Sequence, residues 1–285
     1  MDLNEVPTLL AYTPRERARA LVRGAFPKRR WRVITARDAA ELSATLRRTL
    51  VDAVLVDVGS TVALSTALGI QPSPTHHGGG ASGGEDVWRI AALAQEFPTA
   101  PFFAITPLRT TDAPVVARCA TLDFCDLLVD GMDDPVARDI VAPQTFSARF
   151  VAALAEPPSA LRLASPMQLD TWRAIIGFAG RPVRTTALAR AVGVSREHLS
   201  RNFSTSGAPN LKRVIDLVRM IGAAELAKNP GLDIRDVALI LGFASSSHLA
   251  VTAQRVLGTR PASLSRLRTV DLLDRFLQGR TRSRG

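Results

Sequence analysis

Residues 237–249 read VALILGFASSSHL, and residues 188–203, LARAVGVSREHLSRNF, follow the same plan. Each stretch carries an alanine within a short helical pattern, followed by a glycine, which can adopt a positive φ and so end that helix. A serine then stands where it can cap the next helix, Ser195 in one stretch and Ser245 in the other. This spacing predicts two helix-turn-helix units, in each of which the second helix enters the major groove of DNA.

The rest of the second half is also predicted to be helical. Helical patterns cover residues 167–180, 185–192, 195–203, 210–228, 233–241, 245–257 and 261–268, and residues 269–285 read as a short helix with a basic tail. Residues 157–285 carry a net charge of +12, whereas residues 1–156 carry a net charge of −2. Such asymmetry indicates a polyanion-binding half joined to a regulatory half.

Residues 167–268 resemble the DNA-binding domain of the AraC/XylS family of transcription regulators. The matching features are Leu199, Arg201, Phe203, Arg219, Ala223, Ala224 and residues 233–238, 241–249 and 258–261. The resemblance implies two helix-turn-helix units bridged by one rigid helix. It also implies that they read adjacent major-groove segments of double-stranded promoter DNA.

The resemblance places the DNA-binding residues on the two recognition helices. They are Ser195, Arg196, Glu197, Ser200 and Arg201 in the first unit, and Ser245, Ser246, Ser247, Val251 and Arg255 in the second. Arginine can bond guanine through two hydrogen bonds, and glutamate can accept one from cytosine. The side chains of the first recognition helix are therefore better suited to distinguish bases than those of the second. At Val251 and Ala253 the family usually has an arginine and an aromatic residue, so we expect less base reading from the second helix. The alternative for each polar residue is a solvated position on an amphipathic helix.

The first half alternates strand and helix patterns. Strands are predicted at residues 8–12, 31–34, 53–57, 101–106 and 126–129, and helices at 14–26, 39–48, 85–97, 114–120 and 146–154. The stretch Thr13–Glu16 reads as a capping box for the first helix. Five strand–helix units predict a doubly wound parallel sheet. The predicted fold is thus an α/β domain at 1–156, a proline-containing linker at 157–166, and an all-α domain.

The first half resembles the receiver domain of response regulators, with Asp57 ending the third strand where receivers carry the phosphorylated aspartate. Thr106 matches the receiver's switch hydroxyl. Receivers also have two acidic residues after the first strand and a lysine after the fifth, where this chain has Tyr12, Thr13 and residues 129–131. Asp57 is therefore expected to lack both a metal and a stabilising cation. We interpret the domain as a phosphorylation-independent, receiver-like module for homodimerisation or partner binding.

Two alternatives remain open. One is a response regulator of the same build, controlled by phosphorylation of Asp57. The other is an enzyme, because residues 57–61 resemble the phosphate loop of sugar and acetate kinases, although the other signatures of those kinases do not appear. Neither a cofactor nor a metal is predicted, since His76 and His77 lie in a glycine-rich loop at 71–84 without a third ligand at suitable spacing.

We expect a cytoplasmic regulator without enzymatic activity, because the sequence shows neither a Ser/His/Asp nor a Cys/His catalytic set. No apolar run reaches the roughly 18 residues of a membrane helix, and the N-terminal residues lack the features of a signal peptide. Cys119 and Cys125 exclude a disulfide scaffold and read as reduced core residues. The expected partners are promoter DNA, a second copy of the chain bound through residues 1–156, and RNA polymerase, with no membrane contact.

Overall fold

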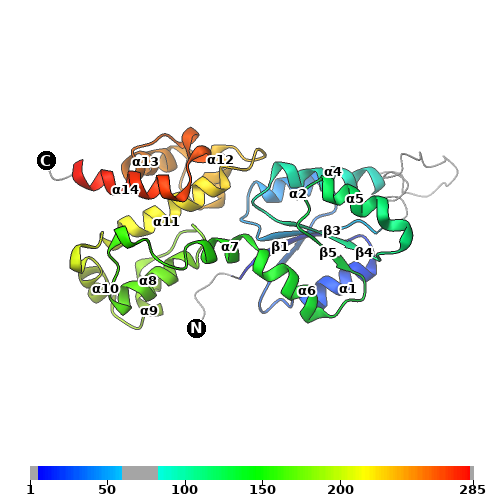
Figure 1. Ribbon diagram of the computed structural model, residues 1–285, viewed down its shortest axis with the longest axis horizontal. Coiled ribbons are helices and arrows are strands. Elements are labelled where there is room, and N and C mark those ends of the chain that lie inside the picture. The colour runs from blue at the N-terminus through cyan, green and yellow to red at the C-terminus, as the bar shows by residue number, and fades with distance from the viewer. Residues whose placement is uncertain (1–5, 60–82, 283–285) are drawn as a thin grey trace. The chain divides into compact units, whose positions relative to one another are not determined.

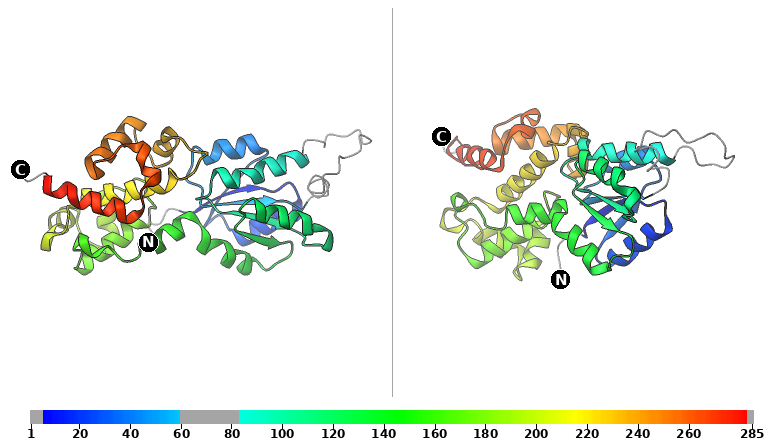
Figure 2. Two further views of the ribbon diagram at one scale, coloured as in Figure 1. Left: turned by 45° about the horizontal axis from the view of Figure 1, so that its top comes forward. Right: turned by 45° about the vertical axis from the view of Figure 1, so that its right-hand side comes forward.

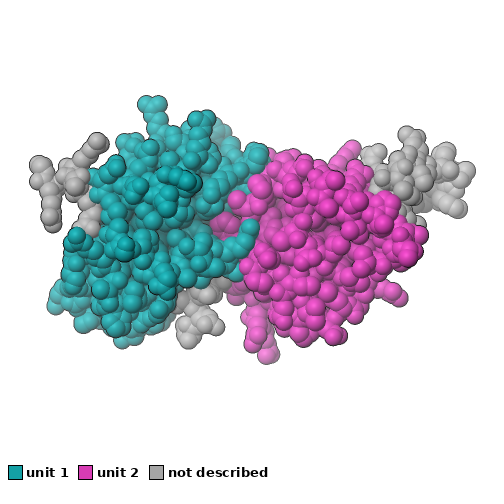
Figure 3. Space-filling model, in the orientation of Figure 1, with its two compact units in different colours: residues 1–5, 147–285 teal, residues 6–146 magenta. Residues whose placement is uncertain are grey.

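The computed structural model, shown in Figure 1, describes residues 6–59 and 83–282. The protein divides into two compact units, residues 6–146 and residues 147–285 (Figure 3). We expected the boundary at the prolines after Glu156. The segment before those prolines is instead anchored in the helical unit, because the buried Trp172 Nε1 donates a hydrogen bond of 2.8 Å to Leu154 O. The helix predicted to close the first domain therefore opens the second.

The first unit is built on a five-stranded parallel sheet. Its strands are β1 (Thr8–Tyr12), β2 (Arg32–Thr35), β3 (Ala53–Asp57), β4 (Phe102–Thr106) and β5 (Asp126–Val129). They lie in the order β2-β1-β3-β4-β5, and every neighbouring pair is parallel. This is the doubly wound order of flavodoxin-like folds, in which the carboxyl ends of the strands form the ligand-facing edge. The predicted α/β fold class is confirmed.

Helices cover both faces of the sheet. They are α1 (Glu16–Ala25), α2 (Ala39–Leu46), α4 (Gly83–Glu96), α5 (Ala113–Thr121) and α6 (Asp134–Val141). α1 and α6 lie on one face, and α2, α4 and α5 on the other (Figures 1 and 2). Every residue of β1, β3 and β4 is buried, as expected for strands covered on both faces, whereas the edge strands β2 and β5 are partly exposed.

Two local predictions in this unit were wrong, and one helix was missed. The missed helix is α6, although Asp133 at its N-cap and Pro135 in its first turn are start signals. The predicted capping box at Thr13 is absent, because α1 begins at Glu16 with Arg15 as its N-cap residue. Cys125 is exposed rather than in the core. Cys119 is buried as predicted, and burial raises the pKa of its thiol to about 12.

The second unit is helical over the residues that the structure describes, as predicted. Its helices are α7 (Phe146–Ala153), α8 (Pro166–Ile176), α9 (Thr185–Ala191), α10 (Arg196–Asn202), α11 (Leu211–Leu226), α12 (Ile234–Ile240), α13 (Ser246–Leu257) and α14 (Thr269–Arg282). The C-terminal helix is longer than we expected, because Leu272 and Phe276 are buried as it packs on α11 and α13. Within the described part of the chain, no helix is long and apolar enough to cross a membrane.

Candidate functional site

The two helix-turn-helix units share one local geometry. Gly193, after α9, and Gly242, after α12, both adopt a positive φ, 70° and 61°. The next residue then turns back to bond the preceding helix: Val194 N donates to Ala189 O at 3.0 Å, and Phe243 N donates to Ala238 O at 2.8 Å. The predicted role of the glycines in ending the first helix of each unit is therefore confirmed.

The same repetition holds at the start of each recognition helix. Ser195 Oγ accepts a hydrogen bond of 3.1 Å from His198 N, and Ser245 Oγ accepts one of 3.1 Å from His248 N. Each serine is thus an N-cap, as predicted. Ser195 and Ser245 accordingly have a structural role, whether or not they also contact DNA.

The central helix α11 is closely packed against the rest of the helical unit. Most of its residues are buried, including Ala223 and Ala224. At Gly222 the helix approaches the loop after α8 so closely that a Cβ placed on Gly222 would lie 2.9 Å from Gly180 Cα. Small residues therefore allow α11 to pack closely on the segment that precedes α9, while the same helix also packs on α12 and α13 of the second unit.

The candidate base-reading residues of α10 lie on its exposed side. Arg196, Glu197, Ser200 and Arg201 are exposed. Leu199 and Phe203 are fully buried, as expected for residues that hold the helix in place. The outer face of α10 therefore offers two guanidinium groups, one carboxylate and one hydroxyl.

The outer face of α13 is less polar. Ser247 is exposed, Ser246 is half-buried, and Val251 is 65% exposed, an unusual degree for a large apolar side chain. An exposed valine on a recognition helix suits contact with a thymine methyl group. Ala253, where the family has an aromatic residue, is buried.

Arg255 has a protein partner that the sequence did not reveal. Its Nη2 donates a 2.9 Å hydrogen bond to Asp216 Oδ2 on α11, and the Asp216 side chain is only 9% exposed. The pair holds α13 against the central helix. The DNA contact predicted for Arg255 stays a prediction, since a phosphate would compete with Asp216 for this guanidinium.

Gln168 is a residue that sequence reasoning missed. Its buried side chain on α8 donates through Nε2 to Phe203 O at 2.7 Å, and its Oε1 accepts from Ser165 N at 2.9 Å. It therefore fixes the C-terminal end of α10 from a neighbouring helix. The spacing of Ser165 and Gln168, which form the capping box of α8, was the signal that could have identified it.

The carboxyl edge of the sheet holds a cluster of one arginine and two aspartates. Asp57 is fully buried at the end of β3 and accepts hydrogen bonds from Arg15 Nε at 2.7 Å, Arg15 N at 3.1 Å and Gly59 N at 3.1 Å. The same guanidinium lies 2.6 Å from Asp57 through Nη2 and donates to Asp130 Oδ2 at 2.6 Å through Nη1. Arg15 thus joins the end of β3 to the residue that follows β5.

The prediction that Asp57 has no cation beside it was wrong, because Arg15 supplies one. Burial is the largest single influence on the pKa of Arg15 and lowers it, but the hydrogen bonds to Asp57 and Asp130 and the negative charges of these two residues together raise it, so the net pKa lies above the ordinary value. The donor set does not fit the Mg²⁺ ion of a receiver domain, because Tyr12 and Thr13 stand in place of the acidic pair and the guanidinium of Arg15 already binds the Asp57 carboxylate. Thr106 Oγ1 is also engaged, since it donates to Asp112 Oδ2 at 3.3 Å.

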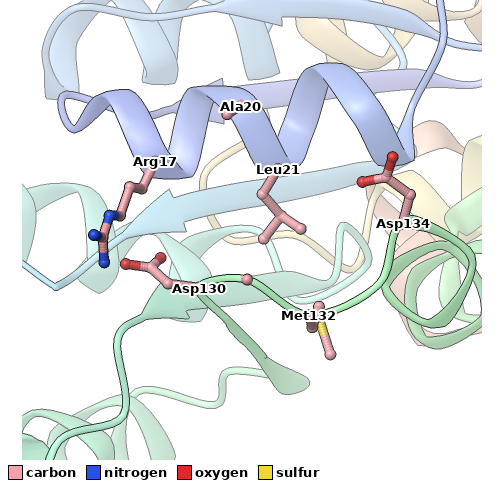
Figure 4. Close-up of a pocket in the computed structure, with 7 residues that line it drawn as sticks. Arg17, Ala20, Leu21, Asp130, Met132 and Asp134 are labelled. Carbon is pink, nitrogen blue, oxygen red and sulfur yellow. The ribbon is translucent and has the colours of Figure 1, made fainter.

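A cavity of about 400 Å³ lies beside this cluster, between α1 and the loop that joins β5 to α6 (Figure 4). Its lining residues are Arg17, Ala20, Leu21, Asp130, Gly131, Met132 and Asp134. Asp130 belongs to both the cavity and the arginine cluster. The kinase-like resemblance and the glycine-rich loop involve Ser60, Thr61, His76 and His77, which lie outside the described residues.

Comparison with known proteins supports the helix-turn-helix interpretation. Residues 188–266 match the family described as helix-turn-helix domain, which confirms the predicted resemblance of this region. Over 164 residues the chain is 29% identical to the HTH-type transcriptional regulator GlxA of Rhizobium meliloti (strain 1021). The similar region covers 57% of this chain and 47% of GlxA, so the chain spans less than half the length of that relative.

Two solved structures resemble the chain only weakly. A response regulator from Thermotoga maritima is 18% identical, with 49% of this chain and 98% of that chain covered and a TM-score of 0.35. Full-length FixJ from B. japonicum is 13% identical, with 87% and 96% covered and a TM-score of 0.32. The receiver-like topology therefore rests on the strand order β2-β1-β3-β4-β5.

Proposed function

We propose that this protein is a sequence-specific DNA-binding transcription regulator, whose helices α10 and α13 read adjacent major-groove segments of promoter DNA. The observation that carries the proposal is the repeated geometry of the two units, in which each exposed recognition helix is capped by a serine after a positive-φ glycine. The net charge of +12 over residues 157–285 supports phosphate binding. Action on promoters implies a cytoplasmic location and makes RNA polymerase a candidate partner.

The two helices have different roles in this proposal. α10 reads bases through the hydrogen-bonding groups of Arg201, Glu197 and Ser200, with Arg196 near phosphate, whereas α13 contributes Ser246, Ser247 and the apolar side chain of Val251. Arginine specifies guanine more strongly than serine or valine specifies any base. α10 is therefore the main reader.

Replacing Arg201 by alanine tests this division. We expect the variant to lose about 1–3 kcal/mol of affinity for the wild-type site and to relax the preference at one base position. Binding selection on randomised duplexes, followed by equilibrium titration at fixed salt, measures both effects. Val251→Ala is expected to change the selected motif less.

The control for lost charge is Arg173→Ala, on α8. Arg173 is exposed, pairs with the exposed Asp170 and lies outside both helix-turn-helix units. Its removal should leave the selected motif intact. A broader motif from Val251→Ala than from Arg201→Ala would show that α13 is the main reader and would reverse the assignment.

We further propose that the receiver-like unit works without phosphorylation and without catalysis. Arg15 supports this, because it binds the Asp57 carboxylate that a phosphoryl group would have to reach. The unit then acts through protein contacts, and we propose a homodimer that brings two DNA-binding units onto paired half-sites. We place the dimer surface at the cavity between α1 and the loop after β5. Leu21 and Met132 give this cavity an apolar lining among charged groups, which supports the choice.

Replacing Ala20 by arginine tests the dimer surface. Ala20 is exposed beside the cavity, so the larger side chain costs little in folding but places two like charges at a symmetric interface. We expect sedimentation analysis of the full chain to show a dimer that is weakened by at least about tenfold in the variant. Ala40→Arg is the matched control, because Ala40 is exposed on α2, a helix that covers the other face of the sheet from α1. A wild-type chain that stays monomeric at high concentration would contradict the proposal.

A further inference from the structure

Arg219 on α11 makes two contacts with the turn of the second helix-turn-helix unit. Its Nη2 donates a hydrogen bond of 3.1 Å to Leu241 O, at the C-terminal end of α12. Its guanidinium carbon lies 3.8 Å from the centre of the Phe243 ring. One side chain of the central helix thus holds both the end of α12 and the turn that follows it.

These contacts continue into the recognition helix. The ring of Phe243 packs edge-to-face against His248, with ring centres 5.6 Å apart. His248 lies in the first turn of α13, and its amide is bound by the capping Ser245. A continuous set of contacts therefore runs from Arg219 through Phe243 to the start of α13, the helix that we propose reads DNA in the second unit.

Burying the guanidinium of Arg219 at this position costs folding stability. Among the residues that the structure describes, the buried Nε of Arg219 finds no hydrogen-bond partner. Burial lowers the pKa of the guanidinium, although nearby Asp216 partly offsets this. An unsatisfied buried donor costs stability, whereas an apolar side chain of similar length would fill the space without that cost. The planar stack and the bond to Leu241 are what only the guanidinium provides.

The first unit is held differently. Its recognition helix α10 is fixed at its C-terminal end, where Gln168 donates to Phe203 O. Arg213 is the other α11 arginine stacked on a phenylalanine, but it faces α14: it lies 4.8 Å from the Phe276 ring and donates to Phe276 O at 3.2 Å. Among these side chains, Arg219 is the one that reaches the turn before α13.

We propose that Arg219 is a positioning residue that sets the orientation of α13, and so determines which bases the second unit reads without touching DNA itself. This inference rests on the proposed function. It predicts that loss of the guanidinium changes the specificity of one half of the binding site and leaves the other half intact.

The test is binding selection with the full chain on randomised duplexes, comparing wild type, Arg219→Leu and Arg219→Lys. The segment read by α10 is identified by the base position that Arg201→Ala relaxes. We expect Arg219→Leu to lose the preference in the other segment and to bind the wild-type motif about tenfold more weakly, the effect of about one lost base contact. Arg219→Lys keeps the charge but not the planar stack, so the same segment should weaken to a smaller extent.

Arg213→Leu is the matched control, because it removes a stacked, hydrogen-bonded arginine from the same helix. We expect it to lower the affinity for all sequences while both segments keep their preferences. Circular dichroism establishes that the variants are folded. If Arg219→Leu does not fold, the motif selected by Arg219→Lys is compared with that of the wild type instead. The inference is overturned if the wild-type chain selects a two-segment motif and the folded Arg219 variants either preserve that motif or lose it equally in both segments. This outcome leaves the proposed function standing. A wild-type chain that selects no motif overturns the proposed function and the inference with it.

Discussion

Replacing Asp57 by asparagine is expected to lower the free energy of unfolding of the sheet-containing unit by about 3 kcal/mol. Removing one partner of a buried ion pair costs about 3–5 kcal/mol, because the other charge is left without its counter-ion. We place the effect at the lower end of this range, since the Arg15 side chain is 22% exposed and keeps Asp130 as a partner. Urea denaturation, monitored by tryptophan fluorescence, measures the change in the free energy of unfolding.

Glu16→Gln is the control for this experiment. Glu16 also pairs with arginines of α1, Arg19 and Arg23, but the three side chains are largely exposed, so the loss of these pairs should hardly change stability.

Wild-type protein incubated with Mg²⁺ and a small phosphodonor should gain no phosphate at Asp57 by intact-mass measurement. A stoichiometric adduct that Asp57→Asn abolishes would contradict the proposed phosphorylation-independent role.

Replacing Gly222 by alanine is expected to destabilise the helical unit by about 2 kcal/mol and to weaken DNA binding with it. The added methyl would lie 2.9 Å from Gly180 Cα and 3.3 Å from Ala179 O, and both are backbone atoms that cannot rotate away. Overpacking costs about 1–3 kcal/mol, and we take the upper end because the contacts are with backbone atoms; subtracting the gain of about 1 kcal/mol in helix propensity leaves the net loss of about 2 kcal/mol. Thermal or urea unfolding of the full chain measures the difference.

Gly279→Ala is the matched control for Gly222→Ala. It makes the same change inside a helix, α14, but its Cβ would meet only ordinary contacts, the nearest being Arg213 Nη2 at 3.7 Å. We expect it to stabilise the protein by up to about 1 kcal/mol. The same substitution should therefore have opposite signs at the two positions, and equal effects would refute the close approach at Gly222.

The strands were predictable to within one residue at each end. β1, β3 and β4 are apolar throughout because they are covered on both faces, and such runs stand out in a sequence. The helix-turn-helix units were predictable for a related reason: a glycine with positive φ and a capping serine are local requirements with few alternatives.

The contacts that act across the chain were not predictable in this way. Arg15 and Asp130 are separated by 115 positions, and nothing in the sequence near either residue indicates the other. We predicted that Arg15 lies inside a local capping box at residues 13–16. In the structure Arg15 is instead the N-cap residue of α1, and its side chain forms the long-range ion pairs with Asp57 and Asp130. The partner of Arg255 on α11 was missed for the same reason, because Asp216 is 39 positions away.

A metal ion at the sheet edge would bind reversibly, and its occupancy would depend on the concentration of that ion in solution. The guanidinium of Arg15 is tethered to the same chain as Asp57 and Asp130, so its effective concentration there is set by geometry and has no dependence on supply. Dilution or a chelator cannot remove it. The charge balance at this edge is therefore established once, when the chain folds, and it is lost only when the chain unfolds.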